Sequence, residues 1–298
     1  MFFEYFVQKL RKHHKIVCTS RKYEQVNGIR KFGLVNPIII GKHGGKKNVN
    51  KLLASLNRSK LLTKKIEKYR PDFLVSFCSP EASRVAYGLG IPHIAFSDSP
   101  HAKAVMKLSL PYVTKLLTPW IIPKKDFGVF GIDYKNIIHY RAIDAGIIIK
   151  NYKQNKKKKL NSKKIILIRP EESEAAYIIK KSKTVKIIKK IVEKFPNEQK
   201  IVLSRYKEQT DELKKIFGSN ISLLSKPVNG KELLSNTDCF IGSGGTMTAE
   251  SGLLGIPTIS VNAVPNRIED FLVKKRIIVR SENSNEISRE IYQSLNNT

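Results

Sequence analysis

The strongest constraint on the fold is an alternation of short runs rich in β-branched residues with longer amphipathic stretches. The alternation occurs in two series, separated by a lysine-rich stretch without apolar periodicity over residues 151–164. Alternating strands and helices are typical of βαβ units around a parallel sheet. We therefore expect an α/β protein with an N-terminal lobe (1–150), a basic linker (151–164) and a C-terminal lobe (165–298). A chain of 298 residues is also long for one hydrophobic core.

The individual elements follow from the periodicity of apolar residues. In the N-terminal lobe the clearest helix covers residues 50–69, and the predicted strands are 15–19, 37–41, 73–78, 93–97 and 137–142. In the C-terminal lobe the predicted strands are 164–168, 200–204, 221–224, 239–243, 258–261 and 277–280. The predicted helices there are 184–195, 207–217, 246–254, 268–274 and 285–295. A further helix over residues 2–12 stands where a Rossmann lobe has its central strand. The first strand of the N-terminal lobe is therefore expected to be missing, either because the true start lies upstream or because the lobe lacks it.

Two segments, residues 72–98 and 238–262, repeat one plan within the chain. Each has an apolar strand, a turn with Ser or Gly, a helix, the tripeptide Gly-Ile-Pro and a second strand. Glycine can adopt the left-handed conformation that ends a helix, and proline then prevents the helix from continuing. The plan predicts equivalent turns at Gly90 and Gly255, either because the lobes are related or because both converge on a favourable turn.

The sharpest motif is the segment 240–250, in which an apolar strand ends at Ser243 and is followed by Gly244, Gly245 and Thr246. Thr246 is predicted to cap the next helix. Free N–H groups and the helix dipole at such a start form an anion site, and glycines allow close approach of a phosphate. Glu250 is expected near the same mouth, where its carboxylate can accept hydrogen bonds from ribose hydroxyls. The alternative is a tight packing turn with a solvent-facing glutamate.

Two arginines extend this candidate site. Arg169 follows the strand 164–168, at the strand edge where ligands bind in open α/β sheets, and Arg205 occupies the matching position after the next strand. Planar, permanently charged guanidinium groups suit a diphosphate. Surface salt bridges would explain the same residues.

In the N-terminal lobe, candidate catalytic residues follow the strand 93–97. Ser99 is predicted as an N-cap with Pro100 at the first helical position. Asp98 and His101 then place a carboxylate and an imidazole at a strand end, where either could act as general base on an acceptor hydroxyl. Structural hydrogen bonding is the alternative. His43 starts a glycine loop that would contribute N–H groups to a substrate or remain a plain basic loop.

The net charge is unusually high, because 55 Lys and Arg stand against 25 Asp and Glu and give +30. Such a charge attracts nucleic acid, an anionic membrane or phosphorylated small molecules, although lysine abundance can also reflect codon usage. The aromatic residues are not interleaved with the basic runs, which argues against specific nucleic-acid binding. No run reaches the roughly 18–20 apolar residues of a membrane span. Cys18, Cys78 and Cys239 are expected as buried core residues, and the expected location is cytoplasmic, peripheral to a membrane.

The segment 243–257, SGGTMTAESGLLGIP, closely resembles the sugar-nucleotide signature of GT-B folds. It is similar to MurG-type glycosyltransferases and non-hydrolysing UDP-N-acetylglucosamine 2-epimerases, and above all to a mainly archaeal family of predicted MurG-like glycosyltransferases. Further matching pieces are residues 41–45, 79–82, 96–102, 169–171 and 204–209. The resemblance implies two Rossmann lobes facing an interlobe cleft, a UDP-sugar held mainly by the C-terminal lobe and no required metal. It assigns Ser243, Gly244 and Gly245 to the diphosphate and Glu250 to the ribose.

These observations predict a glycosyltransferase that moves a sugar from a nucleotide-sugar donor to an acceptor, with an anionic membrane or a lipid-linked acceptor as partner. The nucleotide sugar is then a substrate and not a cofactor. The first alternative is a 2-epimerase, which needs several N-terminal carboxylates, whereas the chain offers none between Asp98 and Asp126. The second is a non-catalytic binder of sugar nucleotides or nucleic acid. No His, Cys and Asp cluster has metal-ligand spacing. The base, sugar, acceptor and oligomeric state stay open.

Overall fold

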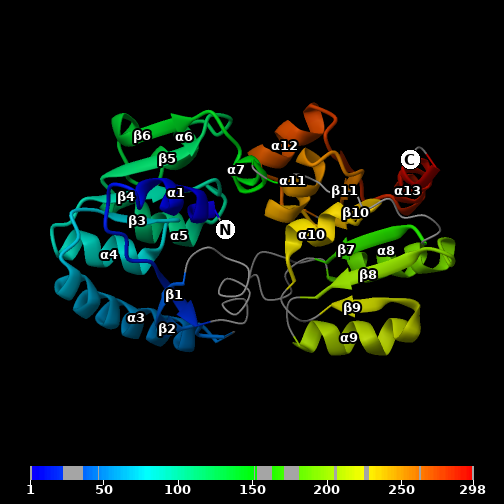
Figure 1. The fold of residues 1–298 in the computed structure, drawn as a ribbon, viewed down its shortest axis with the longest axis horizontal. Coiled ribbons are helices and arrows are strands. Elements are labelled where there is room, and N and C mark those ends of the chain that lie inside the picture. Colours follow the sequence, from blue (N-terminus) through cyan, green and yellow to red (C-terminus); the bar gives the residue numbers. More distant parts are fainter. Residues whose placement is uncertain are drawn as a thin grey trace. The chain divides into compact units, whose positions relative to one another are not determined.

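The computed structural model describes residues 2–22, 36–45, 47–150, 152, 163–170, 181–204, 207–224, 228–261 and 263–296. The chain divides into two compact units, Met1–Asp144 and Ala145–Thr298. Each unit has parallel strands with helices packed around them (Figure 1). Of the expected linker over 151–164, only residues 152, 163 and 164 are described.

The N-terminal unit holds two parallel sheets. Strands β1 (Thr19–Lys22) and β2 (Ile38–Lys42) form one, and β3 (Leu74–Ser76), β4 (His93–Phe96), β5 (Lys115–Pro119) and β6 (Ile137–Tyr140) form the other in that order. The helices are α1 (Phe2–Leu10), α3 (Asn48–Tyr69), α4 (Pro80–Gly88), α5 (Lys103–Ser109) and α6 (Lys125–Gly128). Helix α7 (Asp144–Ile149) begins at the last residue of this unit and otherwise belongs to the C-terminal unit. As expected, a helix precedes the first strand.

The strands of this unit differ in part from the prediction. The strand expected at 15–19 corresponds to β1, which starts four residues later because its pairing with β2 begins at Thr19, opposite Ile38. Cys18 therefore precedes the strand and is half-buried, whereas Cys78 and Cys239 are buried. Strand β5 was missed, because its short run is bounded by Lys115 and Pro119 and lacks a run of β-branched residues.

The C-terminal unit has one six-stranded parallel sheet in the order β12-β11-β10-β7-β8-β9. Its strands are β7 (Ile165–Arg169), β8 (Gln199–Leu203), β9 (Ser222–Leu224), β10 (Cys239–Gly242), β11 (Thr258–Ser260) and β12 (Val279–Arg280). Its helices are α8 (Lys181–Lys194), α9 (Lys207–Phe217), α10 (Gly230–Ser235), α11 (Gly245–Leu253), α12 (Arg267–Lys274) and α13 (Ser284–Asn296). Each predicted strand and helix of this unit is confirmed to within three residues, and α10 is the one α-helix in its described part that was missed.

The sheet of the C-terminal unit is buried on both faces. Successive side chains of β10 point to opposite sides, so Cys239 and Ile241 pack in one apolar cluster and Phe240 in another. Helices α8, α9 and α13 cover the first face, and α10 and α11 cover the second. Burial on two faces explains why these strands appear in the sequence as continuous apolar runs.

The two Gly-Ile-Pro turns have the same geometry. Gly90 ends α4 with φ 67° and Gly255 ends the α11 turn with φ 75°. The amide of Ile91 donates to the carbonyl of Ala86 over 2.9 Å, and that of Ile256 donates to Ser251 over 3.1 Å. Both are the long hydrogen bonds of a helix end with a left-handed glycine. No helix among the described residues is long and apolar enough to span a membrane.

Candidate functional site

Strands β7 and β10 lie side by side in the C-terminal sheet, with Arg169 opposite Gly242 at their carboxyl ends. The strands that follow β7 in sequence, β8 and β9, extend to one side, whereas β11 and β12 extend to the other. The direction of the connections therefore reverses between β7 and β10. Open α/β sheets bind their ligands at this point, outside the carboxyl ends of the strands.

The glycine turn after β10 lies at that point of reversal. Gly244 is the N-cap of α11 with φ 76° and ψ −166°, and no side chain caps the helix. The prediction of Thr246 as the cap is wrong, because the helix already starts at Gly245 and Thr246 is an exposed residue of its first turn. An end of this kind leaves backbone N–H groups and the positive end of the helix dipole available to an anion.

Gly244 lies against the start of α12. A Cβ atom at this position would be 2.9 Å from Glu269 Oε2 and 3.0 Å from Ala263 Cβ. Glu269 is held there by Arg280, whose Nε lies 2.9 Å from Oε1, while Asn266 Oδ1 accepts the Glu269 amide over 2.9 Å. The sequence motif predicted a glycine at this place, but it did not reveal the carboxylate behind it.

Ser243 directly precedes the turn. Its hydroxyl oxygen is buried and makes no hydrogen bond within the described part of the chain. A buried hydroxyl without a partner costs free energy that a bound ligand can recover. Ser243 is therefore available to a group bound at the turn.

Glu250 is buried, with 8% of its surface exposed, so the alternative of a solvent-facing glutamate is wrong. Burial raises the pKa of its carboxyl group to about 7, against the opposing effect of the charges of Lys231 and Arg169. A buried carboxyl group that titrates near neutral pH is typical of ligand-binding and catalytic sites.

Arg169 approaches α11 from the neighbouring strand, since its Nη1 lies 3.4 Å from Met247 Sδ. Lys231, on the missed helix α10, is a further cation whose charge acts on Glu250. The only sequence signal for it is Asn229-Gly230, which gives an extended N-cap to a short helix. Arg205, the second predicted arginine, lies outside the described residues.

The described residues thus bring together the predicted Arg169, Ser243, Gly244, Gly245 and Glu250 at one sheet edge. Cations and free N–H groups can bind a phosphate, and the carboxyl group of Glu250 can accept hydrogen bonds from hydroxyls.

In the N-terminal unit, the segment after β4 differs from its prediction. Helix α5 starts at Lys103 with Ala102 as its N-cap, so Ser99 is not the cap and Pro100 is not in the helix. The carbonyl of Ser99 instead accepts the Ala102 amide over 3.0 Å and closes a turn. The Ser99 hydroxyl donates to Asp98 Oδ1 over 2.6 Å.

Asp98 and His101 are close enough to affect each other. Burial lowers the pKa of His101, and the charge of Asp98 opposes this effect. The imidazole is therefore largely neutral and able to accept a proton at neutral pH.

Tyr140 and Asp144, which were not predicted as site residues from the sequence, lie near Asp98. The Tyr140 hydroxyl donates to Asp144 Oδ1. Asp144 is only 4% exposed, and its second oxygen makes no hydrogen bond within the described residues. Burial raises the pKa of Asp144 to about 7, and the charge of Asp98 adds to the increase. Burial also raises the pKa of Tyr140, again with Asp144 and Asp98 contributing.

His43 lies after β2, which belongs to the two-stranded sheet and not to the sheet that carries Asp98. Its Nδ1 accepts the Gly45 amide over 3.1 Å, so the imidazole shapes its own loop. Across the described residues, no group of three or more His, Cys, Asp and Glu could hold a metal ion.

Solved structures with a similar fold share little sequence identity with this chain. The UDP-GlcNAc 2-epimerase from Neisseria meningitidis bound to UDP-GlcNAc has a TM-score of 0.76 at 15% identity, over 98% of this chain and 87% of that one. The UDP-GlcNAc 2-epimerase from Methanocaldococcus jannaschii, in complex with UDP-GlcNAc and UDP, has a TM-score of 0.70 at 17% identity, over 99% and 89%. The glycotransferase of kitacinnamycin has a TM-score of 0.58 at 13% identity, over 99% and 86%. The fold is thus an α/β fold with parallel sheets of the GT-B type.

A relative by sequence is the uncharacterized protein MJ0665 of Methanocaldococcus jannaschii, which is 27% identical over 267 residues, 86% of this chain and 76% of the relative. The family described as "Protein of unknown function (DUF354)" matches residues 1–297. The chain therefore belongs to the DUF354 family.

Proposed function

We propose that this protein is a glycosyltransferase that binds a nucleotide sugar, of the UDP type, at the carboxyl edge of β7 and β10. The observation that carries the proposal is the group formed at the reversal point by the uncapped start of α11, Arg169 and the buried Glu250. The similarity of the fold to enzymes solved with UDP-GlcNAc supports the same ligand class.

In this proposal the diphosphate lies against the amides of Gly244 and Gly245 and the hydroxyl of Ser243. Gly244 forms this turn with a φ of 76° and a ψ of −166°, a backbone conformation that favours glycine. Arg169 and Lys231 neutralise the negative charge of the diphosphate, and Glu250 accepts hydrogen bonds from the ribose hydroxyls.

Transfer joins an acceptor hydroxyl oxygen to the anomeric carbon of the sugar. The bond from that carbon to the diphosphate oxygen breaks, and the diphosphate leaves with the electron pair. Asp98 or His101 takes the hydroxyl proton as general base. Placing the two reactants together and stabilising the departing diphosphate supply most of the rate enhancement. No step of this mechanism requires a metal ion or a cofactor.

The 2-epimerase remains the second candidate, because Asp144 adds a carboxyl group beside Asp98 that the sequence did not place there. Epimerisation needs groups that remove and return a proton while the nucleotide is expelled and recaptured. Asp144, whose burial raises the pKa of its carboxyl group to about 7, suits the removal and return of a proton near neutral pH.

Thermal unfolding with UDP, UDP-sugars, GDP-sugars, ATP and NAD tests the binding step. A sugar nucleotide at about 100 times its Kd should add about 2.7 kcal/mol to the free energy of unfolding, a shift of a few degrees. Glu250→Gln should lose the shift, whereas Glu193→Gln, on the exposed face of α8, should keep it. If no nucleotide shifts the transition, the proposal is wrong.

NMR of UDP-GlcNAc incubated with the protein separates the two reactions. An epimer that forms without any acceptor identifies the epimerase. Release of UDP only when an acceptor is added identifies the transferase.

A further inference from the structure

Helix α3 exposes a stripe of aliphatic side chains in its first two turns. Val49, Leu52, Leu53 and Leu56 are 63%, 59%, 60% and 59% exposed, whereas Leu62 and Ile66 are the buried residues of this helix. Spacings of three and four residues put the four exposed side chains on one helix face. Single exposed leucines are ordinary, but a row of four indicates an interaction surface.

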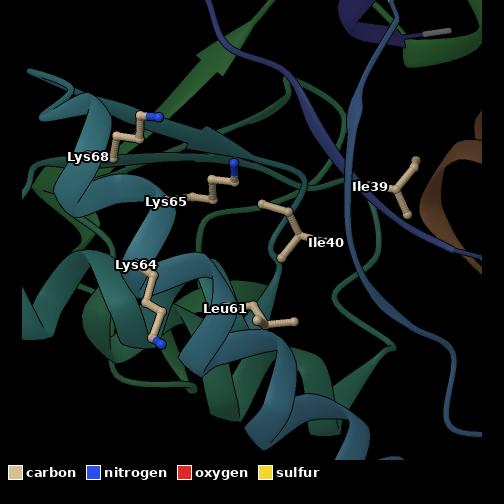
Figure 2. Close-up of a pocket in the computed structure, with 6 residues that line it drawn as sticks. All are labelled: Ile39, Ile40, Leu61, Lys64, Lys65 and Lys68. Atoms are coloured by element: carbon tan, nitrogen blue, oxygen red, sulfur yellow. The ribbon is translucent and has the colours of Figure 1, made fainter.

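The row of Leu52 and Leu56 continues into basic residues, and it winds round the helix by roughly 40° with each step of four residues. Lys60, Lys64 and Lys68 follow one another at intervals of four residues, and Glu67 is the single acidic residue of the helix. Beside them, a cavity of about 330 Å³ is lined by Ile39, Ile40, Leu61, Lys64, Lys65 and Lys68. Figure 2 shows the lysines on α3 and the isoleucines on the neighbouring strand. Lys64, Lys65 and Lys68 make no ion pair within the described part of the chain.

We propose that this face of α3 docks on an anionic lipid bilayer, with the aliphatic stripe between the acyl chains and the lysines against the lipid phosphates. An apolar stripe joined to a basic face is the pattern of helices that lie in a membrane interface. Lysine residues close to the surface are attracted by the negative charge of the lipids.

Charge complementarity favours a bilayer over a second copy of the chain. Two copies that met through α3 would bring their lysines together, and each copy carries a net charge of +30. A nucleic-acid duplex would match the lysines but leave the aliphatic stripe without a partner. A bilayer with anionic headgroups matches both halves of the face.

The inference goes beyond the proposed function and does not depend on it. The residues concerned are on α3 and β2 in the N-terminal unit, whereas the candidate nucleotide site is in the C-terminal unit. The protein could therefore bind a membrane whether or not it binds UDP-sugars, and the two experiments fail separately.

Vesicle flotation with the full chain tests the inference. The wild-type protein should float with vesicles of equal parts phosphatidylcholine and phosphatidylglycerol and stay unbound with phosphatidylcholine alone. Lys64→Gln with Lys68→Gln should weaken the binding by roughly tenfold or more. Leu52→Ser with Leu56→Ser should weaken it by a similar factor. Lys214→Gln with Lys215→Gln, on the exposed face of α9, makes the same change in net charge and should leave binding unchanged.

Equal losses in the α3 and α9 lysine variants would overturn the inference, because they would indicate attraction by net charge alone. Thermal unfolding and light scattering of the leucine variant complete the test. A drop in unfolding temperature well beyond the small effect of serine on an exposed helix would mean that the stripe packs inside the chain. The conversion of a dimer into a monomer would mean that a second copy covers it. Either result would overturn the inference as well.

Discussion

At the scale of single residues, Glu250 and Asp144 share an unusual property. Both are carboxyl groups whose burial raises the pKa to about 7. Glu250 also lies in the field of two cations, whereas Asp144 lies in the field of another carboxylate, Asp98. The two groups therefore suit different tasks, hydrogen bonding to a ligand for Glu250 and proton exchange for Asp144.

Asp144 should make stability depend on pH. In the unfolded chain an aspartate has a pKa of about 3.9, and in the folded chain that of Asp144 is about 7. Between these values the folded state keeps the proton that the unfolded state has lost, so unfolding releases a proton and stability falls as pH rises. Asp144→Asn should remove this fall, and its stability relative to the wild type should rise by about 1 kcal/mol per pH unit across the window.

Urea unfolding at several pH values between 4 and 8 measures this effect. Tyr140→Phe is the control, because it removes the hydrogen bond to Asp144 but keeps the carboxyl group. If the free energies of unfolding of Asp144→Asn and the wild type differ by the same amount at every pH, the carboxyl group titrates normally.

Gly244 gives a second prediction at this scale. Its φ of 76° and ψ of −166° are a conformation that only glycine adopts easily, and a Cβ would contact Glu269 and Ala263. Gly244→Ala should cost on the order of 3 kcal/mol in the free energy of unfolding. Gly218→Ala is the matched control, since Gly218 has φ 53° with no atom within 4 Å of an added Cβ and should cost about 1 kcal/mol. If denaturant titrations give the same loss of unfolding free energy for both variants, Glu269 and Ala263 move aside for the added Cβ at little cost.

At the scale of elements, the two Gly-Ile-Pro turns allow a direct comparison. Gly90 and Gly255 have similar φ values, and neither has an atom within 4 Å of an added Cβ. The cost of alanine at each turn is therefore conformational, and we expect Gly90→Ala and Gly255→Ala to cost the same, about 1 kcal/mol. Hydrogen exchange at the ends of α4 and α11 measures each cost locally. Costs that differ by more than about 1 kcal/mol would mean that the turns are not equivalent.

The elements that the sequence predicted well are those whose limits can be recognised from their own run of residues. Strands of the C-terminal sheet are apolar on both faces, so their limits follow from composition alone. Strand β1 could not be placed in this way, because its pairing with β2 sets its start. The glycine turn and Glu250 were predictable because one motif contains them. Tyr140 and Asp144 were not, since folding brings them to Asp98 from more than 40 residues away.

At the scale of the whole molecule, the net charge of +30 is the property that least depends on the fold. Such a charge attracts any polyanion, and this attraction is screened by salt. A site that is built from directed groups behaves differently, because hydrogen bonds from amides and hydroxyls to a ligand depend little on ionic strength. Salt therefore separates the two kinds of binding.

We expect random-sequence DNA and RNA duplexes to bind without sequence preference and to lose about 10³-fold in affinity between roughly 50 and 200 mM salt. UDP-sugar binding at the α11 start should fall far less over the same range, because few charges are involved and Glu250 and Ser243 contribute hydrogen bonds. Gel shifts with duplexes and calorimetry with UDP-sugars measure both in the same buffers. A nucleic-acid complex that survives high salt or selects a sequence would make nucleic acid a specific partner, and the charge would then belong to a site and not to the protein as a whole.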